Sequence, residues 1–274
     1  MSIIFRLVLG AALVVVVVFL ALPVVALFLR VPPGELVAQL GDERALDALA
    51  VSLKTSAIAH LLILLVGTPA AYFVALRRFR GRALVVSLVE LPLVLPPAVA
   101  GLGLLAAFGR SGLLGGELRA LGLQIPFTQL AVVLAICFVA SPFYIRAAIT
   151  AFEGLDPALL GAARTLGAGP LRVFTRISLP LALGGLGAGS TLAFARGLGE
   201  FGATIMFAGS FPGRTQTAPL AIYDALDEDF EVALALGALL VAVSIGILLA
   251  TKLLTSWTRS PSTSPIPFAP SSSR

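Results

Sequence analysis

Hydrophobic residues occupy six long blocks of this sequence, and short polar segments separate the blocks. The blocks lie at about residues 7–29, 55–76, 84–108, 125–145, from 177 onward, and 232–251. The first block has no charged residue over 23 positions, which is long enough for a helix that crosses roughly 30 Å of hydrocarbon. We therefore predict an all-α, polytopic membrane protein with six transmembrane helices.

The first block also has the basic flank of a cleavable signal peptide, because Arg6 precedes it. Its apolar core is too long for a signal peptide, and no small-x-small cleavage site follows it. We therefore interpret the block as a retained transmembrane helix, followed by a polar and mildly acidic segment at residues 30–54.

Three prolines interrupt the third block, at Pro92, Pro96 and Pro97. Proline lacks an amide donor, so each one leaves a backbone carbonyl unpaired in a helix. Such a break is tolerated at membrane depth only where protein or a water-filled cavity satisfies the freed groups. The pattern predicts either a pore-lining helix or a kinked packing helix. Glu90, near the start of the block, is expected to snorkel or to pair with the arginines at 77–82.

The segment 155–180 is polar and contains helix start and stop signals. Asp156 is typical of an N-cap and Pro157 of a first helical position. Apolar residues recur at three- and four-residue spacing up to Leu166, so a short helix with one apolar face is predicted. Gly167 and Gly169 end that helix, and Pro170 starts a second short one. Two short amphipathic helices between membrane spans indicate a docking segment.

The fifth block is crowded with small residues between positions 184 and 190, which favour close packing against a neighbouring helix. His60 lies in the second block as the single histidine of the chain. A lone histidine in an apolar helix is more often packed and hydrogen-bonded than functional.

Composition agrees with a membrane protein and argues against an enzyme. The 274 residues are 58% hydrophobic and 12% charged, with a net charge of +5. The single cysteine, Cys137, lies in an apolar block, so no internal disulfide is possible. The sequence contains no nucleotide-binding P-loop, no His/Glu zinc pattern and no Ser-His-Asp set. We expect no catalytic residue, no bound cofactor, no metal site and no nucleic-acid partner.

The placement of basic residues predicts the orientation of the chain. With both termini in the cytoplasm, the inner side receives twelve of the nineteen basic residues, in agreement with the positive-inside rule. These residues are Arg6, Arg77, Arg78, Arg80, Arg82, Arg146, Arg164, Arg172, Arg176, Lys252, Arg259 and Arg274. This orientation places segment 155–180 in the cytoplasm.

The same segment resembles the coupling loop of bacterial ABC importer permeases. Ala162-Ala163, then Gly167, then 177–180 as Ile-Ser-Leu-Pro, look like the family's "E-A-A, three residues, G, nine residues, I-x-L-P" pattern. In that family the loop sits in a cleft of the ATP-hydrolysing subunit. Gly161 stands where the family usually has Glu, so an acidic contact is missing or is supplied by Glu153 or Asp156. The resemblance implies a coupling loop that comprises Asp156, Leu160, Gly161, Ala162, Ala163, Arg164, Gly167, Arg172, Leu179 and Pro180.

Two further stretches, 197–205 and 211–223, closely resemble molybdate permeases, and the resemblance covers about residues 51–254. The family implies a type I ABC importer permease fold with cytoplasmic coupling helices. It also implies a homodimer in membrane lipid, two ATP-binding cassette subunits that hold ATP-Mg, and an external oxyanion-binding protein. The protein is then a molybdate (or tungstate) permease of the cytoplasmic membrane. Sulfate and thiosulfate permeases are similar, and a secondary anion carrier is a further alternative, although no convincing internal repeat is visible.

The resemblance and the proline pattern together predict a translocation pathway with a gate. Freed carbonyls would attract cations, so groups that bind anions must be amide donors in the glycine-rich segment 197–202, Thr204 or the start of a broken helix. Arg196 and Glu200 stand one turn apart if helical and are expected to neutralise each other. The predicted pathway and gate residues are Pro92, Pro96, Pro97, Ser141, Gly199, Glu200, Gly202 and Thr204.

We predict three regions along the chain. Residues 1–50 hold the first transmembrane helix and the external linker, and residues 51–256 form the permease core with five transmembrane helices and the coupling loop. Residues 257–274 are rich in serine and proline and are expected to be a disordered cytoplasmic tail.

Overall fold

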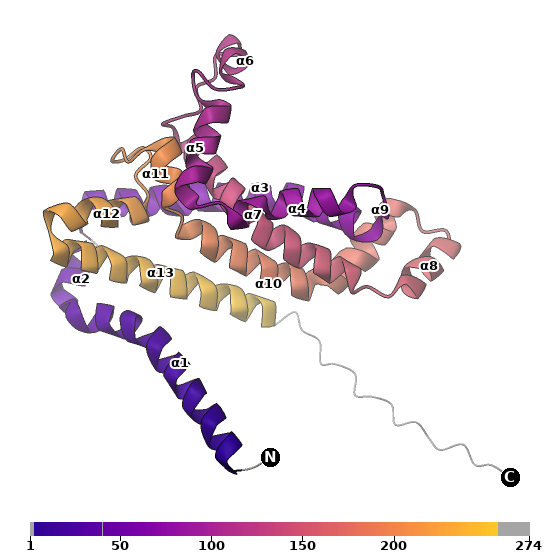
Figure 1. Cartoon of the computed structure of the whole chain (residues 1–274), viewed down its shortest axis with the longest axis horizontal. Coiled ribbons are helices and arrows are strands. Elements are labelled where there is room, and N and C mark those ends of the chain that lie inside the picture. Colours follow the sequence, from indigo (N-terminus) through magenta and orange to yellow (C-terminus); the bar gives the residue numbers. More distant parts are fainter. Residues whose placement is uncertain (1–2, 40, 257–274) are drawn as a thin grey trace.

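A computed structural model describes residues 3–39 and 41–256 of the chain. Within these residues every regular element is helical (Figure 1). The elements are α1 (Ile3–Arg30), α2 (Pro33–Gln39), α3 (Glu43–Leu76), α4 (Arg82–Val94), α5 (Pro97–Phe108), α6 (Gly115–Ala120), α7 (Gln129–Glu153), α8 (Pro157–Thr165), α9 (Pro170–Val173), the π-helical turn η1 (Phe174–Ser178), α10 (Leu179–Leu198), α11 (Gly202–Ala208), α12 (Ala218–Glu228) and α13 (Phe230–Ser256).

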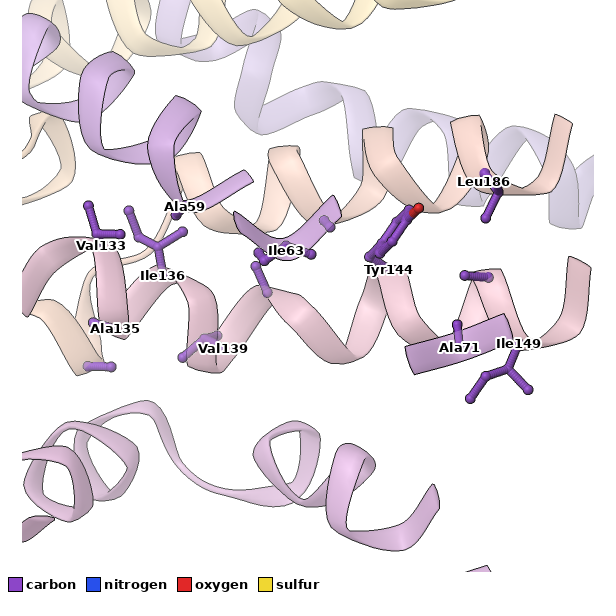
Figure 2. Close-up of a cluster of buried hydrophobic side chains, with 14 of the residues drawn as sticks. Ala59, Ile63, Ala71, Val133, Ala135, Ile136, Val139, Tyr144, Ile149 and Leu186 are labelled. Carbon is purple, nitrogen blue, oxygen red and sulfur yellow. The ribbon is translucent and has the colours of Figure 1, made fainter. Parts of the chain in front are cut away.

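Three long helices, α3, α7 and α10, form the centre of the bundle. Their contact is lined by buried aliphatic side chains, among them Ile63 of α3, Ile136 of α7 and Leu186 of α10 (Figure 2). A Cβ atom added at Gly189 of α10 would lie 2.5 Å from the Cβ of Ala147 on α7. Two carbon atoms that are not bonded to each other do not approach so closely, so glycine is required there. The predicted close packing of the fifth block is confirmed, because the two helices touch through their glycines and alanines.

The third hydrophobic block is not one straight span. It forms α4 and α5, whose axes are bent by 116° at the break between Val94 and Pro97. Pro97 is the first residue of α5, where its missing amide donor costs nothing. In Figure 1, α5 and α6 project from the side of the bundle. Within residues 3–39 and 41–256, five helices are therefore long and apolar enough to cross a membrane, or six when the bent pair counts as one span.

Two expected boundaries were wrong. The second span was expected to begin at residue 55, but its helix begins at Glu43, where Asp42 caps α3 by accepting from the Ala45 amide at 2.9 Å. The fourth span begins at Gln129, not at 125, and extends to Glu153. Its start is fixed by Thr128, whose hydroxyl caps the helix.

Most of the first helix extends away from the bundle in Figure 1, and its most apolar stretch buries no residue. Near its C-terminal end Leu27 packs against Ala235 and Ala238 of α13. α13 packs against α12, α2 and α10, and the predicted tail at 257–274 lies outside the described residues. The all-α, polytopic membrane fold predicted from the sequence is confirmed.

Candidate functional site: an exposed helix, two ion pairs and a buried glutamate

The α8 helix has the N-terminus that the sequence predicts. The Asp156 carboxylate accepts a hydrogen bond from the Ala158 amide at 2.8 Å, and Pro157 follows as the first helical residue. Leu160 points into the protein and is only 5% exposed. The helix ends near Gly167, whose φ of +81° is a backbone conformation that side chains disfavour.

The rest of the apolar face of α8 is left uncovered. Leu159 is 46% exposed and Leu166 is 87% exposed, although both belong to the face that the sequence pattern predicts. Ala162 and Arg164 are also exposed, whereas Gly161 and Ala163 are half-buried. An exposed apolar face on a short polar loop is suited to contact with another protein.

The second short helix is not separate, which corrects the prediction for residues 170–177. Pro170 begins a helix that continues through η1 into α10, so that it runs unbroken to Leu198. Leu179 and Pro180 lie in the first turn of α10, not in a loop. Val173 is buried and anchors the start of this helix, while Arg172 and Arg176 are exposed beside a shallow hollow of about 460 Å³.

Two ion pairs tie the start of the bent span to α7. Arg82 of α4 pairs with Glu153, and the Arg146 guanidinium of α7 lies 2.8 Å from the Glu90 carboxylate of α4. The second pair corrects the expected partner of Glu90, which is Arg146 and not an arginine of the 77–82 loop. Glu153 ends α7 immediately before the α8 loop. The two pairs therefore link that loop to α4.

The same contacts bear on the missing acid at Gly161. Glu153 is already paired with Arg82, and the Asp156 carboxylate caps α8. Each of the two carboxylates therefore already has a contact within the chain.

Glu200 is buried where α10 ends and α11 begins. Its side chain is 1% exposed, and one carboxylate oxygen accepts from Arg196 at 2.7 Å. The other oxygen accepts from the Ala203 amide at 2.8 Å and so caps α11. The expected neutralising pair is confirmed, and it has the additional role of holding α11 in place.

The Glu200 segment packs against the bent span. A Cβ added at Gly202 would lie 2.6 Å from the Cβ of Pro97, and one added at Gly101 would lie 2.6 Å from the Ala203 carbonyl oxygen. Only glycine permits this approach, so α5 and α11 form one tightly packed unit. Thr204 is fully buried there, and no hydrogen-bond partner of its hydroxyl is present among the described residues. We name Pro97, Arg196, Glu200, Gly202 and Thr204 the Glu200 cluster.

Two of the other predicted pathway residues, Pro96 and Gly199, adjoin the cluster in the chain, whereas Pro92 and Ser141 lie elsewhere. Pro92 is inside α4, and Pro96 precedes α5 at the bend. Gly199 is the exposed C-cap of α10. Ser141 of α7 lines a separate apolar cavity of about 410 Å³ between α3, α5 and α7. The structure thus brings four of the predicted residues together, Pro97, Glu200, Gly202 and Thr204.

Sequence reasoning missed one polar network, at the start of α12. Asp224 accepts hydrogen bonds from Ser210 at 2.6 Å and from Gln216 at 2.7 Å. These residues fall in or beside the stretch 211–223 that resembled a family, but a regular hydrophobic pattern gives no signal for such pairs. His60 donates to or accepts from Ser190 at 2.9 Å and packs on Phe194, as expected of a structural histidine.

Residues 63–260 match the family described as the inner membrane component of binding-protein-dependent transport systems. The molybdenum transport system permease protein ModB of Mycobacterium tuberculosis (strain ATCC 25618 / H37Rv) is 46% identical over 239 residues, which cover 85% of this chain and 88% of the relative. ModB of Escherichia coli (strain K12) is 43% identical over 212 residues, which cover 77% of this chain and 92% of the relative.

Solved structures with the same fold include a bacterial alginate ABC transporter in complex with alginate pentasaccharide-bound periplasmic protein. It has a TM-score of 0.75 at 17% identity and covers 94% of this chain and 96% of its own. An inward-facing MetNI methionine ABC transporter has a TM-score of 0.60 at 17% identity, and the match covers 78% of this chain and 95% of the transporter chain. The fold is therefore that of an ABC importer permease. Since the family match takes in the bent helix pair, α8 and the Glu200 cluster, the chain belongs to the inner membrane components of binding-protein-dependent transport systems.

Proposed function

We propose that this chain is the transmembrane permease subunit of an ABC importer that carries molybdate, or the similarly sized tungstate, across the cytoplasmic membrane. The observation that carries the proposal is the similarity over most of the chain to proteins named molybdenum transport permeases. A multi-pass helical chain with a short exposed docking helix is the kind of subunit that such a system requires.

The partners follow from the same proposal. Two copies of the chain form the pathway in the lipid bilayer, and two separate subunits bind and hydrolyse ATP-Mg. An external binding protein delivers the oxyanion. Both termini and α8 face the cytoplasm, in line with the distribution of arginines. Two uncovered leucines, Leu159 of α8 and Leu166 at its C-cap, provide the apolar contact with the ATPase.

The ion pairs supply a route from the motor to the bent span. When ATP binding closes the two ATPase subunits, α8 moves with them and shifts the end of α7. Arg82–Glu153 and Arg146–Glu90 carry this displacement to α4. The break at Pro96 lets α5 change its angle to α4, because the freed backbone offers little resistance there. α5 then carries α11 with it through the glycine contacts.

The Glu200 cluster is the gate in this mechanism. Arg196 compensates the buried carboxylate, so the cluster presents no free positive charge that would hold an oxyanion tightly. The Thr204 hydroxyl has no hydrogen-bond partner among the described residues, so it is a neutral donor that would bind a passing anion weakly. Weak binding suits a permease that receives its substrate from a separate high-affinity protein and releases it on the other side.

The substrate is tested by ATP-driven uptake in proteoliposomes that contain this chain, its ATPase and its binding protein. Radiolabelled molybdate is the transported probe, and unlabelled tungstate or sulfate is the competitor. We expect tungstate to compete about as well as molybdate, and sulfate to compete poorly. Preferred uptake of sulfate would replace the proposal by a sulfate permease.

A further inference from the structure

A large cavity lies where α5, α6 and the segment before α7 meet. It has a volume of about 1160 Å³, and its walls include the end of α5 and the loop that follows α11. Phe127, in the segment before α7, packs against Phe211, in the loop after α11, with ring centroids 6.2 Å apart. In the orientation predicted from the arginine distribution, this cavity opens on the external side of the membrane. The polar residues that line it are Arg110, Ser111, Arg119, Gln124, Thr128 and Arg214.

The cavity has basic groups but no acidic ones in its lining. The Arg119 guanidinium donates to the main-chain carbonyl oxygen of Arg110 at 2.9 Å, which holds the Arg119 side chain against the turn that carries Arg110. The described residues give Arg110, Arg119 and Arg214 no ion-pair partner, since the ion pairs use Arg82, Arg146 and Arg196. All three cavity arginines are exposed.

Two acidic residues lie near the rim without neutralising it. Glu117 is on α6 and is exposed, outside the lining. Asp47 of α3 lies beside the turn that carries Arg214, since a Cβ added at Gly213 would be 3.5 Å from its carboxylate. Neither acid is within ion-pair distance of a cavity arginine in the part of the chain that the structure describes.

The turn that carries Arg110 is tightly packed and requires a glycine at position 115. A Cβ added at Gly115 would lie 2.4 Å from the Gly109 carbonyl oxygen and 2.5 Å from that of Arg110. Phe127, in the opposite wall, has a φ of +60°, which is rare for a residue with a side chain. A tight glycine turn and a strained aromatic thus define the shape of the cavity before any ligand enters.

The three cavity arginines are also unexpected on the external side of a membrane protein. Arginines are depleted on the external side of membrane proteins, and twelve of the nineteen basic residues of this chain fall on the inner side. Three of the remaining seven converge on this one cavity. Guanidinium groups bind tetrahedral oxyanions through paired hydrogen bonds, so their convergence has a chemical use.

We propose that this cavity, which we name the arginine vestibule, binds a divalent tetrahedral oxyanion before the anion enters the pathway. That this anion is the transported one rests on the proposed function above. The vestibule connects directly to the gate, because α5 forms its floor and packs against α11. Phe108 of α5 and Phe207 of α11 are in ring contact at 6.3 Å. The cavity is much larger than one such ion, so it holds the ion weakly and with part of its hydration shell.

The test measures equilibrium binding of radiolabelled molybdate to the purified permease–ATPase complex in nanodiscs, with the binding protein left out. The triple variant R110Q/R119Q/R214Q should weaken binding at least about tenfold, because it removes charge-assisted hydrogen bonds. Wild-type binding should also weaken as salt rises. The control is Arg44→Gln, an exposed arginine on the same predicted side that does not line the cavity. It should bind like the wild type.

Folding is checked with a thiol-reactive dye on Cys137, the only cysteine in the chain. If the triple variant unfolds early, the single change Arg214→Gln replaces it, since this exposed side chain has no hydrogen bond within the described residues. That variant should then weaken binding several-fold.

Equal binding by the wild type and the arginine variants would overturn the proposal. So would variants that keep the ion but lose association with the binding protein, because the vestibule would then be a protein docking surface. Wild-type liposomes that import molybdate while the vestibule binds nothing would refute this inference alone. Failure of wild-type import would instead refute the proposed function.

Discussion

Replacing Arg196 by glutamine should destabilise the chain more than replacing its partner Glu200, although both changes break the same ion pair. The difference lies in burial, because the Glu200 side chain is 1% exposed and the Arg196 side chain is 29% exposed. Arg196→Gln leaves a buried carboxylate with one remaining charge-stabilising contact, the Ala203 amide. Glu200→Gln leaves a cation that can turn outward, and a glutamine oxygen can still cap α11.

The magnitudes follow from these environments. Loss of one partner from a buried pair costs roughly 3 kcal/mol when the other charge stays buried. Glu200→Gln leaves the partly exposed Arg196 unpaired, and it should lower the free energy of unfolding by about 1 kcal/mol. A shift of about 1 kcal/mol changes the midpoint of thermal unfolding by roughly 2–4 °C in a protein of this size. Arg196→Gln should therefore lower the midpoint by roughly 6–12 °C, and Glu200→Gln by about 2–4 °C.

The double variant R196Q/E200Q provides the decisive comparison. It removes the buried charge, so it should unfold at a higher temperature than R196Q alone, even though it carries one more substitution. The assay follows reaction of a thiol-specific dye with Cys137, which is half-buried between α7 and α3 and reacts on unfolding. A double variant as unstable as the sum of the single variants, or an E200Q variant less stable than R196Q, would refute the reasoning.

Three further changes test the proposed route from motor to gate. Gly167→Ala should cost about 1–2 kcal/mol, because φ is +81° there, and should lower substrate-stimulated ATP hydrolysis. Gly101→Ala should cost about 1–3 kcal/mol in thermal unfolding and abolish uptake, since its Cβ would lie 2.6 Å from a carbonyl oxygen of α11. Reversing one charge of the pair Glu90–Arg146 should lower uptake with little change in stability, and reversing both should restore it.

Matched glycines serve as controls for two of these changes. Gly184 lies inside α10 and Gly103 inside α5, and nothing stands within 4 Å of a Cβ added at either one. Alanine at these positions should leave hydrolysis and uptake unchanged and should raise stability by up to about 1 kcal/mol. If the control variants behaved like Gly167→Ala and Gly101→Ala, a general effect of changing glycine to alanine would explain the results. The positive φ of Gly167 and the close contact of Gly101 with α11 would then not be the cause.

Local signals in the sequence were sufficient for several features of the structure. The cap at Asp156 and the left-handed position at Gly167 depend on residues close together in the chain, and both are present. The hydrophobic blocks identify the membrane helices for the same reason. The prolines of the third block predicted a break, although not a bend as large as 116°.

The join between α9 and α10 could not be predicted in this way. Gly169 and Pro170 are typical of a helix start, and Pro180 normally marks another one. The structure instead widens the helix by one π-helical turn, in which the Leu179 amide donates to the Phe174 carbonyl oxygen. A wider turn accommodates Pro180, which has no amide to donate, and the helix continues without a break.

The partners of the charged groups also escaped prediction. Arg82 and Glu153 are 71 residues apart in sequence, and only the packing of α4 on α7 brings them together. Arg110 and Arg214 likewise belong to loops that carry no common pattern, and they share one cavity because α5 bends away from α4. Such contacts depend on tertiary structure, so hydrophobic periodicity contains no information about them.

The central claim is that a separate motor drives this chain through α8. It is tested most directly by molybdate uptake into proteoliposomes that hold the chain and its binding protein, with and without the ATPase subunits. The account predicts uptake only when the ATPase and ATP are both present, and loss of that uptake when the exposed Leu166 at the C-cap of α8 is changed to aspartate. Uptake at the same rate in liposomes without the ATPase would contradict it.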